Sequence, residues 1–228
     1  MMSKESYKMD MCNGPVLQKV IAFSLPLMLS SCLQLLFNAA DVIVVGRFAG
    51  STSLAAVGST TELLSLLTTL FIGFSIGANV NVARTLGNQD DQGTKDGIHT
   101  AVSVSILSGS AMILLGFLFG RPMLQWMGTP ADVIDKASLY LMIIFIGMPS
   151  NMAYNFGSAI LRAMGDTKRP LYFLSVAGVL NVVLNLIFVI VLHMDVAGVA
   201  LATILSETLS AVLILNCLCR TDGPCHLN

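Results

Sequence analysis

Long stretches without any charged residue limit this chain to very few folds. Five such stretches, each 21–25 residues long, cover 20–40, 63–83, 97–120, 137–161 and 170–194. A sixth, 196–219, is interrupted only by Glu207. Because a transmembrane α-helix needs about 20 consecutive apolar residues, the sequence predicts an all-α, polytopic membrane protein. We expect six spanning helices, at 16–46, 60–84, 97–119, 137–161, 170–192 and 197–218.

The composition leaves little room for a soluble domain. Charged residues make up 11% of the 228 positions, less than half the share in an average soluble protein. We therefore expect a cytoplasmic segment at 1–15, a transmembrane lobe at 16–218 and a cytoplasmic tail at 219–228. The net charge is −1 and no basic block occurs, so the expected partner is the lipid bilayer and not nucleic acid.

The basic residues are divided unequally between the two sides that the expected helices define. One side holds nine of them: Lys4, Lys8, Lys19, Arg84, Lys95, Arg162, Lys168, Arg169 and Arg220. The other side holds three: Arg47, Arg121 and Lys136. Cytoplasmic loops carry the excess of Lys and Arg, so we expect both termini in the cytoplasm and the protein in the cell membrane.

Polar residues recur at helical spacing inside four of the apolar stretches. These stripes are Gln34, Asn38 and Asp41; Asn151, Asn155 and Ser158; Asn181 and Asn185; and Thr203, Glu207 and Ser210. Residues spaced i, i+4, i+7 share one helix face, so the bundle is expected to have a polar interior. Interhelical hydrogen bonding is the structural alternative. It explains the amides well and the two carboxylates, Asp41 and Glu207, badly, since a charge in hydrocarbon is costly.

Several segments resemble the amino-terminal half of multidrug and toxic compound extrusion (MATE) transporters. They are FNAADVIVVGRFAG at 37–50, IGFSIGANVNVARTLGNQD at 72–90, AILRAMGDTKRPL at 159–171, NVVLN at 181–185 and GVALATILSE at 198–207. The resemblance extends from about residue 14 to 218. It implies a family with two six-helix lobes that exports cationic, amphiphilic compounds in exchange for H⁺ or Na⁺, with no cofactor beyond the coupling ion.

The resemblance also implies roles for individual residues. Asp41 resembles the ion-coupling acid of the lobe, with Asn181 and Thr203 as its hydrogen-bonding companions. Asn185 belongs to the same set but departs from the family pattern, because several members carry a second aspartate there. Tyr140 and Asn155 resemble residues of the substrate cavity, to which the polar stripes add Gln34, Asn38 and Glu207. Glu207 is a candidate replacement for the missing acid, or a structural residue.

One six-helix lobe implies an incomplete transporter. The expected partners are small organic cations and a second six-helix lobe, supplied by another chain or by self-association. An ion channel or a membrane scaffold without coupled transport remains an alternative.

Two further patterns are weaker indications of function. Gly73 to Gly77 reads G-x-S-x-G, as in a serine hydrolase, but no histidine is expected at the same depth, so helix packing explains these glycines better than an intramembrane protease. Cys217, Cys219, Cys225 and His226 follow no zinc-site spacing, and no metal site is expected.

Overall fold

Six long helices make up the computed structural model, which describes residues 16–221. They are α1 (Val16–Val44), α2 (Ser51–Gly87), α3 (Asp91–Trp126), α4 (Ile134–Ala163), α5 (Lys168–Asn185) and α6 (Asp195–Cys219). Short π-helical segments, η1 (Val45–Ala49) and η2 (Leu186–Val191), continue α1 and α5. All six helices are long and apolar enough to span a membrane, which confirms the predicted fold class. The expected segment 1–15 and the tail beyond Thr221, with Cys225 and His226, lie outside the described residues.

The helix ends differ from the expected ones where a helix continues beyond its apolar stretch. α2 begins at Ser51 and not at 60, directly after Gly50, whose φ of 87° makes the turn. Its first turns are held in the core by buried Ala56 and Val57. α3 begins at Asp91, where the Asp90 carboxylate caps it by accepting from Gly93 N at 2.9 Å. A charge-free stretch measures the thickness of the hydrocarbon layer, so it underestimates helices that extend into the aqueous phase.

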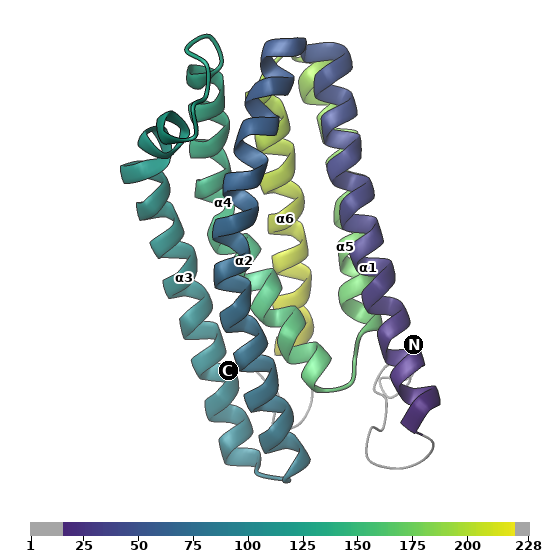
Figure 1. The fold of residues 1–228 in the computed structure, drawn as a ribbon. Coiled ribbons are helices and arrows are strands. Elements are labelled where there is room, and N and C mark those ends of the chain that lie inside the picture. The colour runs from purple at the N-terminus through teal and green to yellow at the C-terminus, as the bar shows by residue number, and fades with distance from the viewer. Residues whose placement is uncertain (1–15, 222–228) are drawn as a thin grey trace.

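The helices pack in two groups that α6 joins. α4 lies at the centre and packs against α2, α3 and α6, whereas α1 packs mainly against α5, and α5 against α6 (Figure 1). α1 and α5 approach closely because the ring of Phe37 lies directly against Gly178, in the space that a Cβ there would fill. Few contacts join α1 to α2 or α5 to α4. The site described below lies between these two groups.

Glycines on α3 let it pack closely against α4, whereas the two glycines on α2 that were expected to form a helix contact do not. A Cβ on Gly109 would meet the backbone of Pro149 at 2.6 Å, and Gly116 faces the ring of Phe145. Gly73 and Gly77, expected to form a helix contact, have no neighbouring atom within 4 Å of where a Cβ would be, among the described residues. That expectation is therefore wrong for residues 16–221. The glycines at these positions lie on an exposed face of α2.

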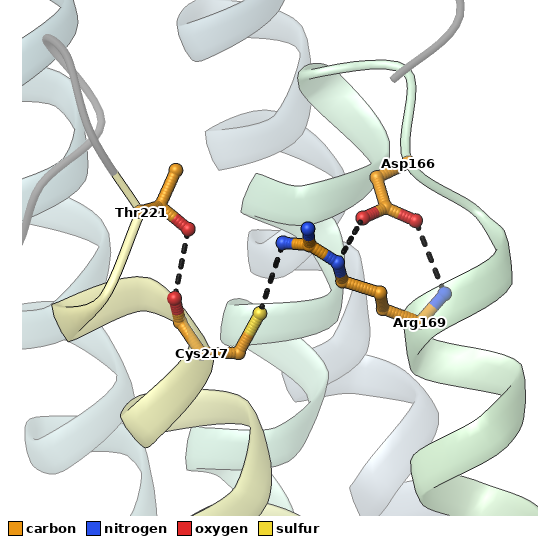
Figure 2. A network of polar contacts seen from close by, with 4 residues as sticks. All are labelled: Asp166, Arg169, Cys217 and Thr221. Carbon is orange, nitrogen blue, oxygen red and sulfur yellow. Dashed lines mark hydrogen bonds and ion pairs between the residues drawn. The ribbon is translucent and has the colours of Figure 1, made fainter. Parts of the chain in front are cut away.

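Polar contacts tie α6 to its neighbours at both ends of the bundle. At one end, Arg169 pairs with Asp166 at 3.2 Å and donates to Cys217 Sγ at 3.4 Å, which links the α4–α5 connection to the end of α6 (Figure 2). At the other end, Lys136 Nζ lies 2.6 Å from Asp195 Oδ2 and 2.9 Å from Ser53 Oγ. This second cluster joins the first turns of α2, α4 and α6. α6 is thus fixed at both ends while it forms one wall of the site.

Candidate functional site

Asp41 is held in a hydrogen-bonded chain that crosses from α1 through α5 to α6. Asn185 Nδ2 donates to Asp41 Oδ1 and also to Asn181 Oδ1, the latter at 3.2 Å. Asn181 Nδ2 in turn approaches Thr203 Oγ1 at 3.5 Å. The structure therefore brings together all four residues of the expected ion-coupling set. The close α1–α5 packing at Gly178, one turn from Asn181 and two turns from Asn185, positions the two sides of these hydrogen bonds.

Asn185 leaves an acceptor unused beside the carboxylate of Asp41. The side chain is fully buried, and its Oδ1 has no hydrogen-bond partner among the described residues. Its amide nitrogen already serves Asp41 and Asn181, so this oxygen can accept only from an added group. Carboxylate, amide and hydroxyl oxygens are the ligands that hard cations prefer. The arrangement suits a small cation or a proton donor. Because residue 185 is an amide, Asp41 is the one acid in this series of hydrogen bonds.

Asp41 opens on a cavity of about 270 Å³ between the two helix groups. Its polar lining residues are Gln34, Asn38, Asp41, Thr68, Asn151, Tyr154, Asn155, Asn181, Thr203, Ser206, Glu207 and Ser210. They come from α1, α2, α4, α5 and α6. Each of the four polar stripes found in the sequence thus contributes to this cavity, although Ser158 and Asn185 are not among its lining residues.

Four of the five residues expected in the cavity line it: Gln34, Asn38, Asn155 and Glu207. Tyr140 is the exception, because it is 7% exposed and packs in the hydrophobic core. The prediction that Tyr140 lines the cavity is therefore wrong for the described residues.

Thr68 and Tyr154 also line the cavity, although neither was among the residues expected there. Thr68 shares its face of α2 with Thr61, Ser65 and Ser75, a polar stripe that was not among the four expected. Tyr154 is one position away from the stripe at Asn151 and Asn155, and its length brings it into the cavity.

Glu207 receives a hydrogen bond at the opposite side of the cavity from α1. Asn151 Nδ2 donates to Glu207 Oε1 at 2.8 Å, and Asn155 Nδ2 donates to Asn151 Oδ1 at 2.9 Å. No Lys or Arg is among the described residues that line this cavity. Two carboxyl groups and no cation make the cavity a site for positive charge. Among residues 16–221, no group of three His, Cys, Asp or Glu forms a metal cluster.

Both helices that carry the Asp41–Asn185 contact change to π-helix immediately beyond it. η1 begins four residues after Asp41, and η2 begins directly after Asn185. The two segments contact each other. A π-helical turn in an α-helix is frequent at functional sites, because its wider turn weakens the backbone ladder locally.

Comparison with known proteins assigns this helical lobe to a family. The family model described as MatE matches residues 26–187, which include most of α1, all of α2 to α5 and the Asp41–Asn185 contact. The chain belongs to the MatE family. The match confirms the resemblance seen in the FNAADVIVVGRFAG and AILRAMGDTKRPL segments.

The relatives of this MatE protein are transporters, and they are about twice as long. The chain is 34% identical over 202 residues to the probable multidrug resistance protein YpnP of Bacillus subtilis, with 87% of the chain and 44% of that protein covered. It is 23% identical over 202 residues to the multidrug export protein MepA of Staphylococcus aureus. An outward-facing structure of a MATE multidrug resistance transporter superimposes with a TM-score of 0.85 at 27% identity, covering 92% of this chain and 47% of that one. The chain spans about half the length of the relatives it matches.

Proposed function

We propose that this MatE lobe binds organic cations and exports them in exchange for H⁺ or Na⁺, in an assembly with a second six-helix lobe. The observation that carries the proposal is Asp41, an acid at membrane depth whose cavity offers amide and hydroxyl oxygens but no basic residue among its described lining. An intramembrane acid of this kind is a functional site by default, because burying it without a role is costly.

The acids of the cavity also explain why exchange is a better proposal than passive conduction. A proton or Na⁺ bound beside Asp41 neutralises the charge that an organic cation requires, so the two ligands oppose each other. Mutually exclusive binding of ion and cargo is the basis of antiport. A channel or scaffold has no need of such competition. The names of YpnP and MepA, a multidrug resistance protein and a multidrug export protein, agree with a cargo of this kind.

The protease alternative finds no support in the geometry. Ser75, the serine of the G-x-S-x-G segment, donates to Ile72 O of its own helix at 2.8 Å. His99 and His193 lie near helix ends, in α3 and in the α5–α6 connection. A serine nucleophile needs a base within hydrogen-bond reach, and neither histidine is recorded as a partner of Ser75 within residues 16–221.

Competition between cation and ion can be measured on the purified chain. We expect it to bind tetraphenylphosphonium in detergent, with an affinity that falls about tenfold when H⁺ or Na⁺ saturates the site. Titration calorimetry in choline and sodium buffers, over a range of pH, measures this dependence. No binding, or binding that is indifferent to both ions, would contradict the proposal.

The orientation that the basic residues predict is part of the same proposal. Gln92 and Gln125 are exposed near opposite ends of α3, so they report on the two sides of the membrane through one helix. In a cysteine-free background, we expect an impermeant maleimide to label Gln125→Cys but not Gln92→Cys in intact cells. Both should react after permeabilisation, which controls for access. The reverse pattern would place the termini outside.

A further inference from the structure

A second cavity adjoins the first and has the opposite electrostatic character. Its volume is about 430 Å³, and it shares Gln34, Tyr154 and Asn155 with the cavity of Asp41. It extends to the end of α4 and the first turn of α5, where Arg162 lines it. No acidic residue is among its described lining. The two cavities therefore form one tract with two acids in one part and a guanidinium in the other.

Arg162 has donor groups that its neighbours do not use. Its Nε donates to Ser158 O at 3.1 Å, and this is the one hydrogen bond it makes among the described residues. Within residues 16–221, neither terminal nitrogen of the guanidinium has a partner, and this planar pair matches the two oxygens of a carboxylate or a phosphate group. Asn79 faces the same cavity and donates to Ala159 O at 2.6 Å, which leaves the second hydrogen of its amide available.

Arg162 is half-buried, one residue before the end of α4, and its side chain lines the second cavity. It belongs to the most enclosed of the six spanning helices, α4, which packs against α2, α3 and α6. On that helix it continues the polar face of Asn151, Asn155 and Ser158, at spacings of four, three and four residues. At 1.5 Å per residue, Arg162 lies about 16 Å along the helix from Asn151, the residue that bonds Glu207.

We propose that Arg162 forms an anion-binding subsite for the phosphate or carboxylate group of a ligand that occupies the tract. A ligand with a cationic group near Asp41 and Glu207 and an anionic group at Arg162 complements both ends of the tract. The cargo class is therefore extended from plain cations to zwitterionic amphiphiles. The cationic end of this ligand rests on the function proposed above, whereas the anionic end rests on Arg162 alone.

Binding by the purified chain in a phosphate-free maltoside detergent tests the subsite. The probes are inorganic phosphate, the soluble short-chain lipid dihexanoylphosphatidylglycerol, and tetraphenylphosphonium as the cation. We expect Arg162→Gln to weaken binding of the phosphate-bearing probe about tenfold or more, and Arg162→Lys to weaken it less, because lysine keeps the charge but not the fork. The affinity for tetraphenylphosphonium should not change in either variant. Circular dichroism and thermal unfolding establish that each variant is folded.

The two phosphate probes distinguish the sources of the anionic group. Arg162-dependent binding of inorganic phosphate supports a site for a free phosphoryl group, and Arg162-dependent binding of the lipid alone supports a headgroup site. Equal affinities of wild type and Arg162→Gln for both probes would overturn the proposal. If Arg162→Gln does not fold, Arg162→Lys is the deciding variant. An unchanged affinity of Arg162→Lys for both phosphate probes would then overturn the proposal. If wild type binds the phosphate probes through Arg162 but does not bind tetraphenylphosphonium, the proposed function is refuted and the anion subsite is supported.

Discussion

Asp41→Asn is expected to remove the effect of Na⁺ on cation binding, to reduce the effect of pH, and to weaken that binding by roughly 30-fold or more. The substitution keeps the shape of the side chain and removes its charge. Asn185 then bonds a neutral amide, and the carboxylate that cation and coupling ion share is gone. Removing one partner of a charge pair in a desolvated site costs about 2–5 kcal/mol, which sets the scale of the loss. Calorimetric titration with tetraphenylphosphonium, at low and high Na⁺ and pH, measures both effects.

Glu62→Gln is the matched control for this variant. Glu62 lies on an exposed face of α2 and is not among the residues that line the cavity, so the same change of charge should leave the titration as in wild type. Thermal unfolding of both variants checks that the bundle is intact. Wild-type affinity and ion dependence in Asp41→Asn would assign the coupled ion to another group. Equal losses in Asp41→Asn and Glu62→Gln would point to the overall charge of the lobe instead.

Glu207→Gln is expected to reduce the number of protons displaced by cation binding by about one. Family members with a second aspartate at the position of Asn185 have two acids around the α1–α5 contact, whereas this chain carries its second acid on α6. Glu207 faces the same cavity as Asp41 and interacts with it electrostatically. Its bond from Asn151 can persist in the glutamine variant, because the carbonyl oxygen still accepts. Calorimetry in buffers of different ionisation enthalpy counts the protons.

Asn185→Asp in the Glu207→Gln background tests whether the second acid can be relocated. The new carboxyl group lies next to Asp41, so the number of protons displaced by cation binding should rise again to the wild-type value. If the count is the same in wild type and in Glu207→Gln, then Glu207 is a structural residue that orders Asn151. If the count falls but is not restored by Asn185→Asp, the position on α6 is itself required.

The sequence was sufficient to predict the helices and most of the cavity because both depend on simple periodicity. A charge-free stretch of membrane length is a helix, and amides spaced three or four residues apart share its face. The convergence of Gln34, Asn155 and Glu207 follows from those two rules, once each helix turns its polar face inward. The family resemblance added the roles that the residue types alone left open.

Other features depended on contacts between helices, which periodicity does not contain. The burial of Tyr140 reflects the central place of α4, where one face meets the cavity and the others meet α2, α3 and α6. Arg162 was counted as a loop charge, since a cation at a helix end is ordinarily exposed to water. Gly73 and Gly77 have the spacing of a packing motif, yet they face outward, because the same spacing serves any face of a helix.

The paired π-helical segments have a consequence for how the lobe can change its sequence. A π turn holds one more residue than an α turn, so the ends of α1 and α5 beyond the Asp41–Asn185 contact each accommodate an additional residue. Deleting that residue from one segment alone would restore an α-helix and rotate everything beyond it by about 100°. η1 and η2 lie against each other, so the rotated end would present the wrong side chains to its neighbour. The geometry of each π-helical segment therefore depends on the other, although the two lie in distant parts of the chain.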